Sequence, residues 1–157
     1  ELVARGAQES GCNIMDTRMA GLGEQFAMFM LVSGSWDAIV KLEDSLERLR
    51  GREQLDVICH RTAARAGRQD LMPYAIEVVA TDRPGIVCEI AEFFAARNIA
   101  IEDMSSYCYP AAHTGTRMFS LHMSISVPVD TSIAGLRGDL LEICDQLNLD
   151  YIMEPVK

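Results

Sequence analysis

Residues 74–105, from Tyr74 to Ser105, read YAIEVVATDRPGIVCEIAEFFAARNIAIEDMS and indicate the class of fold. It opens with β-branched and apolar residues that predict a strand over 74–80. After the turn TDRPG, the apolar residues of 86–97 recur at helical spacing and predict an amphipathic helix. A second strand is expected from Ile99. The order strand, turn, helix, strand therefore opens an α+β domain.

The residues that follow complete the same domain. Residues 117–127 alternate polar and apolar side chains, which predicts a half-buried strand. Residues 131–147 predict a second amphipathic helix, capped by Thr131 or Ser132. The segment LDYIMEP then predicts a short strand that ends at Pro155. The predicted order over 74–157 is βαββαβ, which is the ferredoxin-like order.

The start of the chain resembles this domain. GCNIMD begins at Gly11 and NIAIED begins at Asn98, 87 positions later, and residues 24–32 alternate as 117–127 do. LDVIC, residues 55–59, matches the closing strand. Four apolar positions of a helix over 35–49 match the later helix 94 positions on; they are Ile39, Leu42, Leu46 and Leu49, against Ile133, Leu136, Leu140 and Ile143. We therefore predict two ferredoxin-like βαββαβ repeats.

The alignment predicts that the first repeat is incomplete. Glu1 corresponds to Cys88, so the leading strand of the first repeat and its counterpart of TDRPG are expected upstream of residue 1. This leaves an unpaired position in the first sheet unless another chain or segment fills it. We predict a first repeat over 1–60, a linker over 61–73 and a second repeat over 74–157.

Two features of the first repeat and linker have alternative interpretations. Arg61, Arg65 and Arg68 form a basic island in an acidic chain. They are either solvated or a contact for an acidic partner or for the acidic second repeat. The segment SGSW suits a helix N-cap, with Trp36 either buried or an anchor for a partner.

Composition and charge exclude several classes of protein. The chain has 157 residues, of which 49% are apolar, enough for a buried core. Its net charge of −9 argues against direct binding to nucleic acid, which normally requires a basic surface. Five cysteines without a CxxC pair predict buried thiols in a reducing, cytoplasmic setting, and no metal. No apolar run approaches the ~20 residues of a membrane-spanning helix.

No constellation for catalysis or for a cofactor is recognised. Three histidines, His60, His113 and His122, lie on different predicted elements and at no metal-ligand spacing. Adjacent Glu102 and Asp103 are expected on opposite faces of a strand. The segment GLG at 21–23 predicts a hairpin turn rather than a phosphate loop. We therefore expect a protein that is not an enzyme.

The turn TDRPG can serve as a plain connection or as a small anion site. Asp82 can accept hydrogen bonds from the backbone of the turn, and Pro84 sets one φ near −65°. Gly85 lets the backbone approach a ligand. The helix that follows has unpaired N–H groups and the positive end of its dipole at the turn, an arrangement that binds carboxylates.

A βαββαβ unit with DRPGI between its first strand and helix, and NIAIED leading its second strand, resembles the ACT domain. Members of that family commonly bind amino acids and regulate an attached or partner protein. By this resemblance the ligand-binding residues are those of the turn, the first helical turn and the start of the next strand: Asp82, Arg83, Pro84, Gly85, Ile86, Val87, Asn98 and Ile99. The groove is expected to close against a neighbouring repeat or chain.

The longer segment GCNIMDTRMAGLGEQFAMFMLVSGSW, residues 11–36, looks like the first repeat of tandem ACT chains that repress glycine cleavage genes. The resemblance implies a chain that senses a small amino acid, glycine, and restrains a DNA-binding activator without touching DNA. The alternative is an ACT regulatory subunit that modulates an amino-acid-metabolic enzyme in trans. Homo-oligomer formation is left open.

Overall fold

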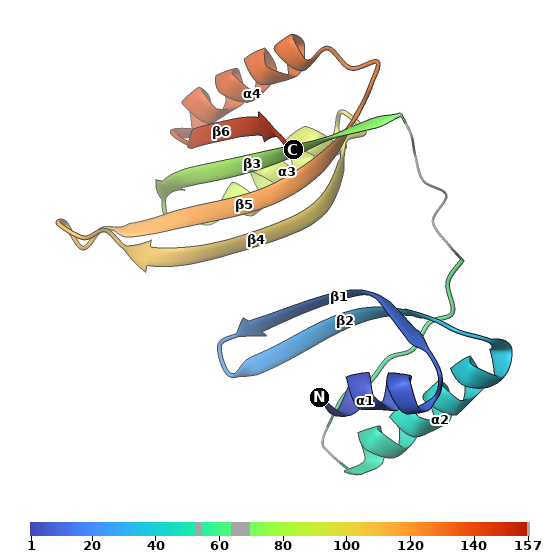
Figure 1. Ribbon diagram of the computed structural model, residues 1–157. Helices are drawn as coiled ribbons and strands as arrows, with labels where there is room; N and C mark the ends of the chain where they lie inside the picture. Colours follow the sequence, from blue (N-terminus) through green and yellow to red (C-terminus); the bar gives the residue numbers. More distant parts are fainter. Residues whose placement is uncertain (53–54, 64–69, 157) are drawn as a thin grey trace. The chain divides into compact units, whose positions relative to one another are not determined.

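The computed structural model describes residues 1–52, 55–63 and 70–156. The chain divides into two compact units, residues 1–64 and 65–157, each described here by itself (Figure 1). Unit 2 contains the complete ferredoxin-like arrangement and unit 1 contains part of it.

Unit 2 has the predicted βαββαβ order (Figure 1). Its elements are β3 (Leu71–Thr81), α3 (Ile86–Ala95), β4 (Ala100–Pro110), β5 (Arg117–Pro128), α4 (Ile133–Leu147) and β6 (Asp150–Pro155). The four strands form one antiparallel sheet in the order β4-β5-β3-β6. The predicted α+β class is confirmed. β3 begins at Leu71 rather than at Tyr74, because its ladder with β5 extends to the pair Leu71–Pro128.

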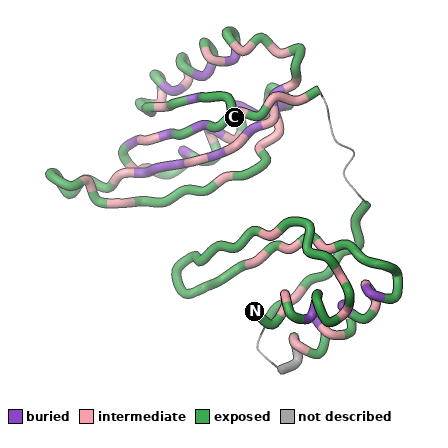
Figure 2. The backbone as a smooth tube through the Cα atoms, viewed as in Figure 1, coloured by how far each residue is buried: buried purple, intermediate pink, exposed green. Residues whose placement is uncertain are grey.

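The core of unit 2 lies between one face of this sheet and both helices. Buried positions are concentrated in the helices and strands of unit 2 (Figure 2). Along β3, Ile76, Val78 and Ala80 are buried, whereas Glu77 is exposed. Buried residues of α3, such as Phe94, and of α4, such as Leu140, belong to the same cluster. Both helices therefore cover the same face. Burial of each such large apolar side chain contributes about 1.5–3 kcal/mol.

Unit 1 contains α1 (Leu2–Glu9), β1 (Asn13–Leu22), β2 (Gln25–Ser33) and α2 (Trp36–Arg52). β1 and β2 form a two-stranded antiparallel hairpin (Figure 1). The predicted turn at GLG is confirmed, with Gly23 at φ +61° between the strands. A small core forms where α1 meets α2, around Ala7, Leu42 and Leu46.

The junction between helix and second strand is the same in both units, as the repeat predicts. After α1, Gly11 adopts φ +77°; after α3, Asn98 adopts φ +54°. The next residues, Cys12 and Ile99, each donate a backbone hydrogen bond to the carbonyl five residues earlier, at 2.9 and 3.0 Å. Both helices therefore end in the left-handed cap that redirects the chain into a strand.

The strands that follow carry a bulge at equivalent positions. Pairing shifts between Ile14 and Asp16 in β1, and between Ile101 and Asp103 in β4, 87 positions later. The bulge interrupts strict alternation at Glu102, so the expectation that Glu102 and Asp103 occupy opposite faces does not hold there. A shared irregularity of this kind supports the duplication more strongly than a shared apolar pattern does.

Burial along α2 and α4 fits the predicted alignment. Leu42 and Leu46 of α2 are buried, as are their counterparts in α4, 94 positions later. The flanking pairs, such as Ile39 with Ile133, are half-buried in both helices. An alignment at 98 positions also pairs buried residues, such as Ala38 with Leu136, because an amphipathic pattern nearly repeats every four residues.

The predicted closing strand of unit 1 is wrong. Residues 55–59 are described and form neither strand nor helix. In unit 2 the closing strand β6 pairs only with β3. Among its described residues, unit 1 has no strand in the position of β3, so 55–59 has nothing with which to form a ladder. Val57 packs instead against the core around Leu42 and Leu46.

The start of α2 and the predicted linker meet in unit 1. Ser35 caps α2 as expected, because its Oγ accepts a hydrogen bond from the Ala38 N–H at 3.3 Å. Trp36 is 70% exposed rather than buried. The Arg61 guanidinium stacks over the Trp36 ring at 4.1 Å and forms an ion pair with Glu43 at 2.8 Å. Arg61 is thus engaged within unit 1, and Arg65 and Arg68 lie outside the described residues.

Candidate functional site

The turn before α3 leads into the N-terminus of the helix through a residue with a left-handed backbone conformation. Gly85 is the N-cap, with φ +99° and ψ −17°. No side chain caps this helix. The Glu89 N–H donates to the Gly85 carbonyl at 2.9 Å, so the N–H groups of 86–88 precede the helical ladder. The positive end of the helix dipole is therefore at this turn.

Asp82 fastens the turn to the sheet. Its carboxylate forms an ion pair with Arg117 of β5, at 2.8 Å from Oδ2 to Nε. Its own N–H donates to the Arg117 carbonyl at 2.9 Å. Asp82 thus links the turn to β5, and this link fixes the position of the turn relative to the sheet.

An opposite-charge pair lies beside the turn. Arg83 donates two hydrogen bonds to Glu89, at 2.9 and 2.6 Å. The bond from Arg83 lowers the pKa of Glu89 below its ordinary value and raises that of the guanidinium. Glu89 was not among the predicted site residues. The available signal was its position in the first turn of α3, where acidic side chains interact with the helix dipole.

Most of the other predicted site residues can contact a ligand through their backbone rather than through their side chains. The side chains of Ile86 and Ile99 belong to the core, with 1% and 4% of their surface exposed. Pro84 is exposed, as is Val87 at 39%. Any ligand at this turn therefore meets peptide N–H groups, the Arg83–Glu89 pair and the edge of Val87.

Asn98 and Ile99 lie at the opposite end of α3 from the turn. α3 has 10 residues. At 1.5 Å per residue the two ends are about 15 Å apart along the helix axis. One amino acid is too small to bridge that distance. Unit 2 alone therefore does not bring the two halves of the predicted site together.

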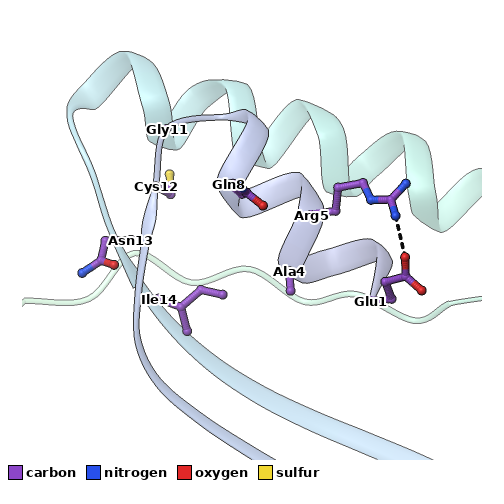
Figure 3. Close-up of a pocket in the computed structure, with 8 residues that line it drawn as sticks. All are labelled: Glu1, Ala4, Arg5, Gln8, Gly11, Cys12, Asn13 and Ile14. Atoms are coloured by element: carbon purple, nitrogen blue, oxygen red, sulfur yellow. Dashed lines mark hydrogen bonds and ion pairs between the residues drawn. The ribbon is translucent and has the colours of Figure 1, made fainter.

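Unit 1 has a hollow at the position equivalent to Asn98 and Ile99 (Figure 3). Its volume is about 790 Å³, and it is lined by Glu1, Ala4, Arg5, Gln8, Gly11, Cys12, Asn13 and Ile14. Gly11 and Cys12 are the counterparts, 87 positions earlier, of Asn98 and Ile99. Arg5 and Glu1 form an ion pair at one end, on the exposed side of α1 (Figure 3). The hollow thus combines charged and amide groups with a helix-to-strand junction.

The remaining candidates form no catalytic constellation among the described residues. His122 lies 3.4 Å from Glu77 and stacks on Tyr107 with an interplanar angle of 12°. No group of three or more His, Cys, Asp or Glu within 1–52, 55–63 and 70–156 is placed to hold a metal ion. None of the helices in these residues combines the length and the apolar character that crossing a membrane requires.

The five cysteines correct one expectation. All are free, and only Cys144 is fully buried, which raises its pKa to about 11. Cys12 is half-buried, and the other three, Cys59, Cys88 and Cys108, are exposed. Most of the thiols are therefore surface groups rather than small core residues.

Comparison with known proteins agrees with the repeat architecture. The model of the ACT domain family matches residues 2–60. The glycine cleavage system transcriptional repressors of Escherichia coli (strain K12) and Shigella flexneri are each 30% identical over 147 residues. That match covers 93% of this chain and 77% of each relative.

Two solved structures share the fold over nearly the whole chain. A crystal structure assigned to a glycine cleavage system transcriptional repressor has a TM-score of 0.72 and 25% identity, covering 99% of this chain and 87% of that one. A protein of unknown function from Galdieria sulphuraria has a TM-score of 0.78 and 21% identity, covering 99% and 88%. The chain belongs to the ACT-domain family that includes the glycine cleavage system transcriptional repressor of E. coli.

Proposed function

We propose that this chain is a non-enzymatic, amino-acid-responsive regulator that represses glycine cleavage genes in the cytoplasm through a DNA-binding partner. The observation that carries the proposal is the 30% identity to the E. coli repressor across 93% of the chain. The net charge of −9 supports the indirect route, because such a surface repels the phosphate backbone.

The ligand of the proposed site is a small zwitterion, with glycine the first candidate. Its carboxylate meets the N–H groups of 86–88, where the helix dipole favours negative charge. Its ammonium meets the Glu89 carboxylate, which the Arg83 contact keeps ionised by lowering its pKa. The pair at 2.6–2.9 Å thus presents both signs of charge beside Gly85.

The site proposed here is completed by surface from outside unit 2. The turn Asp82–Val87 and the junction at Asn98 and Ile99 are about 15 Å apart along α3. Each can therefore form one wall of a pocket whose other wall belongs to another domain or another copy. An enclosed pocket is what a small ligand needs, since most of its surface must be buried.

Calorimetric titration of glycine, alanine and serine into the chain tests the ligand. The proposal expects saturable heat with at least one of the three and a smaller response as the side chain grows. Leucine serves as a control ligand that presents the same zwitterion on a larger body. Absence of heat with any amino acid would leave the turn as a structural connection only.

A further inference from the structure

The hairpin of unit 1 has an inner face, which meets the helices of the unit, and an outer face on the opposite side. Val32 of β2 packs against the core that α1 and α2 form, so Val32 and every second residue before it face inward. The residues between them face outward, and so do their partners across the ladder with β1. The outer face therefore comprises Asp16, Arg18, Ala20 and Leu22 of β1 with Gln25, Ala27, Phe29 and Leu31 of β2.

The outer face is exposed and largely apolar. Phe29 has 77% of its surface exposed, Leu22 71% and Leu31 48%. Ala20 and Ala27 pair with each other between these larger residues and are exposed as well. Figure 2 shows that most of the hairpin is exposed. Apolar patches of this kind on the surface of a protein mark interaction sites.

Unit 2 shows that a complete four-stranded sheet leaves the equivalent face open and makes it polar. The shared bulge aligns the two hairpins, so β2 residues match β5 residues 93 positions later. The outward residues of β5 at the matching positions are polar: Ser120, His122 and Ser124 in place of Ala27, Phe29 and Leu31. His122 and Glu77 of β3 expose 44% and 55% of their side chains on this face. A neighbouring strand therefore does not cover the face, and the apolar residues of unit 1 indicate a different partner.

We propose that the outer face of the hairpin binds the same face of a second copy of this chain, as one sheet stacked on another. The charged residues of the two strands are Asp16 and Arg18, and both lie on the outer face. The face is therefore neutral, although the whole chain carries −9. A second copy brings a basic group to Asp16 and an acidic group to Arg18, whereas a strongly acidic or basic partner would repel one of the two. This inference does not depend on the proposed function.

The order of side chains along β2 also makes the outer face complementary to itself. Phe29 lies between Leu31 on one side and Ala27 on the other. A two-fold axis that lies between the sheets at Phe29, perpendicular to the strands, places Leu31 of each copy opposite Ala27 of the other. A large side chain thus meets a small one across the ~10 Å that separates stacked sheets. Because the face spans a single hairpin, we expect a dimer with a micromolar dissociation constant rather than a permanent dimer.

Sedimentation velocity of the 157-residue chain over a range of concentrations tests the proposal. We expect a monomer–dimer equilibrium in the wild type. Phe29→Ser should raise the dissociation constant of the dimer by about tenfold or more, because it removes the central side chain from both copies. Phe26→Ser is the matched control: Phe26 lies on the same strand and is 68% exposed, but it faces inward, so the dissociation constant should not change. Thermal melts establish that both variants fold.

Exchange of the two charges tests whether the occupant is a second copy. Asp16→Arg and Arg18→Asp should each weaken self-association, because each variant places like charges on both faces. A mixture of the two variants should form a heterodimer, since their faces then attract each other. A chain that stays monomeric at about 0.5 mM would overturn the proposal. So would a mixture that fails to associate, or a dimer that Phe26→Ser disrupts and Phe29→Ser does not, since that result assigns contact to the inner face.

Discussion

Replacing Gly85 with alanine tests the backbone geometry on which the turn depends. Gly85 sits at φ +99°, a region that costs an L-residue about 1–2 kcal/mol. The added Cβ would lie 3.5 Å from Glu89 Oε1 and 3.9 Å from Arg83 Nη1, which is ordinary contact. Steric clash therefore adds little, and we expect Gly85→Ala to lower the free energy of unfolding by about 1–2 kcal/mol.

Gly115 provides a matched control in the same unit. It has φ +68° and nothing within 4 Å of an added Cβ, so Gly115→Ala carries similar backbone strain away from the turn. Urea denaturation followed by far-UV circular dichroism measures both losses. Trp36, which lies in unit 1, reports separately by fluorescence on the unit that neither substitution touches.

Titration of glycine into the two variants then distinguishes a direct role of Gly85 in ligand binding from an indirect effect of lower stability. We expect Gly85→Ala to lose glycine binding, because its methyl group stands beside the Arg83–Glu89 pair, and Gly115→Ala to bind as the wild type does. A Gly85→Ala protein as stable as wild type would refute the argument from φ. Equal loss of binding in both variants would show that stability, not the turn, governs affinity.

Three further predictions concern pH and nucleic acid. Arg83 lowers the pKa of Glu89 in the folded protein, so the pair stabilises the protein at pH values above the ordinary glutamate pKa. This contribution is lost as the pH falls through the lowered pKa. Glu89→Gln should therefore make the melting temperature less dependent on pH in the acid range. Burial raises the Cys144 pKa to about 11, so the thiol ionises in the unfolded chain before it ionises in the folded one. The free energy of unfolding should therefore fall by about 2–3 kcal/mol between roughly pH 9 and 11. Cys144→Ala should remove this pH dependence from urea denaturation. The purified chain should show no salt-sensitive shift of duplex DNA in a gel near physiological ionic strength, whereas a tight, sequence-specific shift would redirect attention to its arginines.

The sequence predicts the elements whose pattern is local. Strands such as β5 and helices such as α3 carry dense periodicities of 2 and 3.6 residues, and their existence and order were predicted correctly. The repeat was visible for the same reason. A shift of four residues aligns α2 with α4 almost as well, since a helical apolar pattern looks similar after about one turn.

The failures share a physical cause, which is dependence on a partner distant in the sequence. Residues 55–59 have strand-like composition, but a strand exists only beside another strand, and unit 1 offers none there among its described residues. Trp36 is 70% exposed, and the Arg61 guanidinium that stacks on its ring comes from a segment 25 residues later. The Arg83–Glu89 pair is not predicted because Arg83 lies in the turn and Glu89 in α3, and no local sequence pattern indicates that their side chains meet.

In the candidate site, too, the features that depend on local sequence were predictable and those that depend on distant surfaces were not. The strand-to-helix turn and its glycine follow directly from TDRPG, because proline and glycine constrain the backbone locally. The distance between that turn and Asn98 follows from the length of α3, which the sequence also predicts. What encloses a ligand depends on surfaces outside unit 2, and no local pattern describes them.

Affinity capture from native cells, with and without added glycine, tests whether the chain acts through a glycine-dependent, DNA-binding partner. The tagged chain is used beside Gly85→Ala, with mass spectrometry to identify what is retained and a gel shift of glycine cleavage promoter DNA by the eluate. We expect wild type to retain a DNA-binding protein in a glycine-dependent manner, and Gly85→Ala to retain it without that dependence. Promoter binding by the chain alone, or capture of a metabolic enzyme in place of a DNA-binding protein, would contradict it.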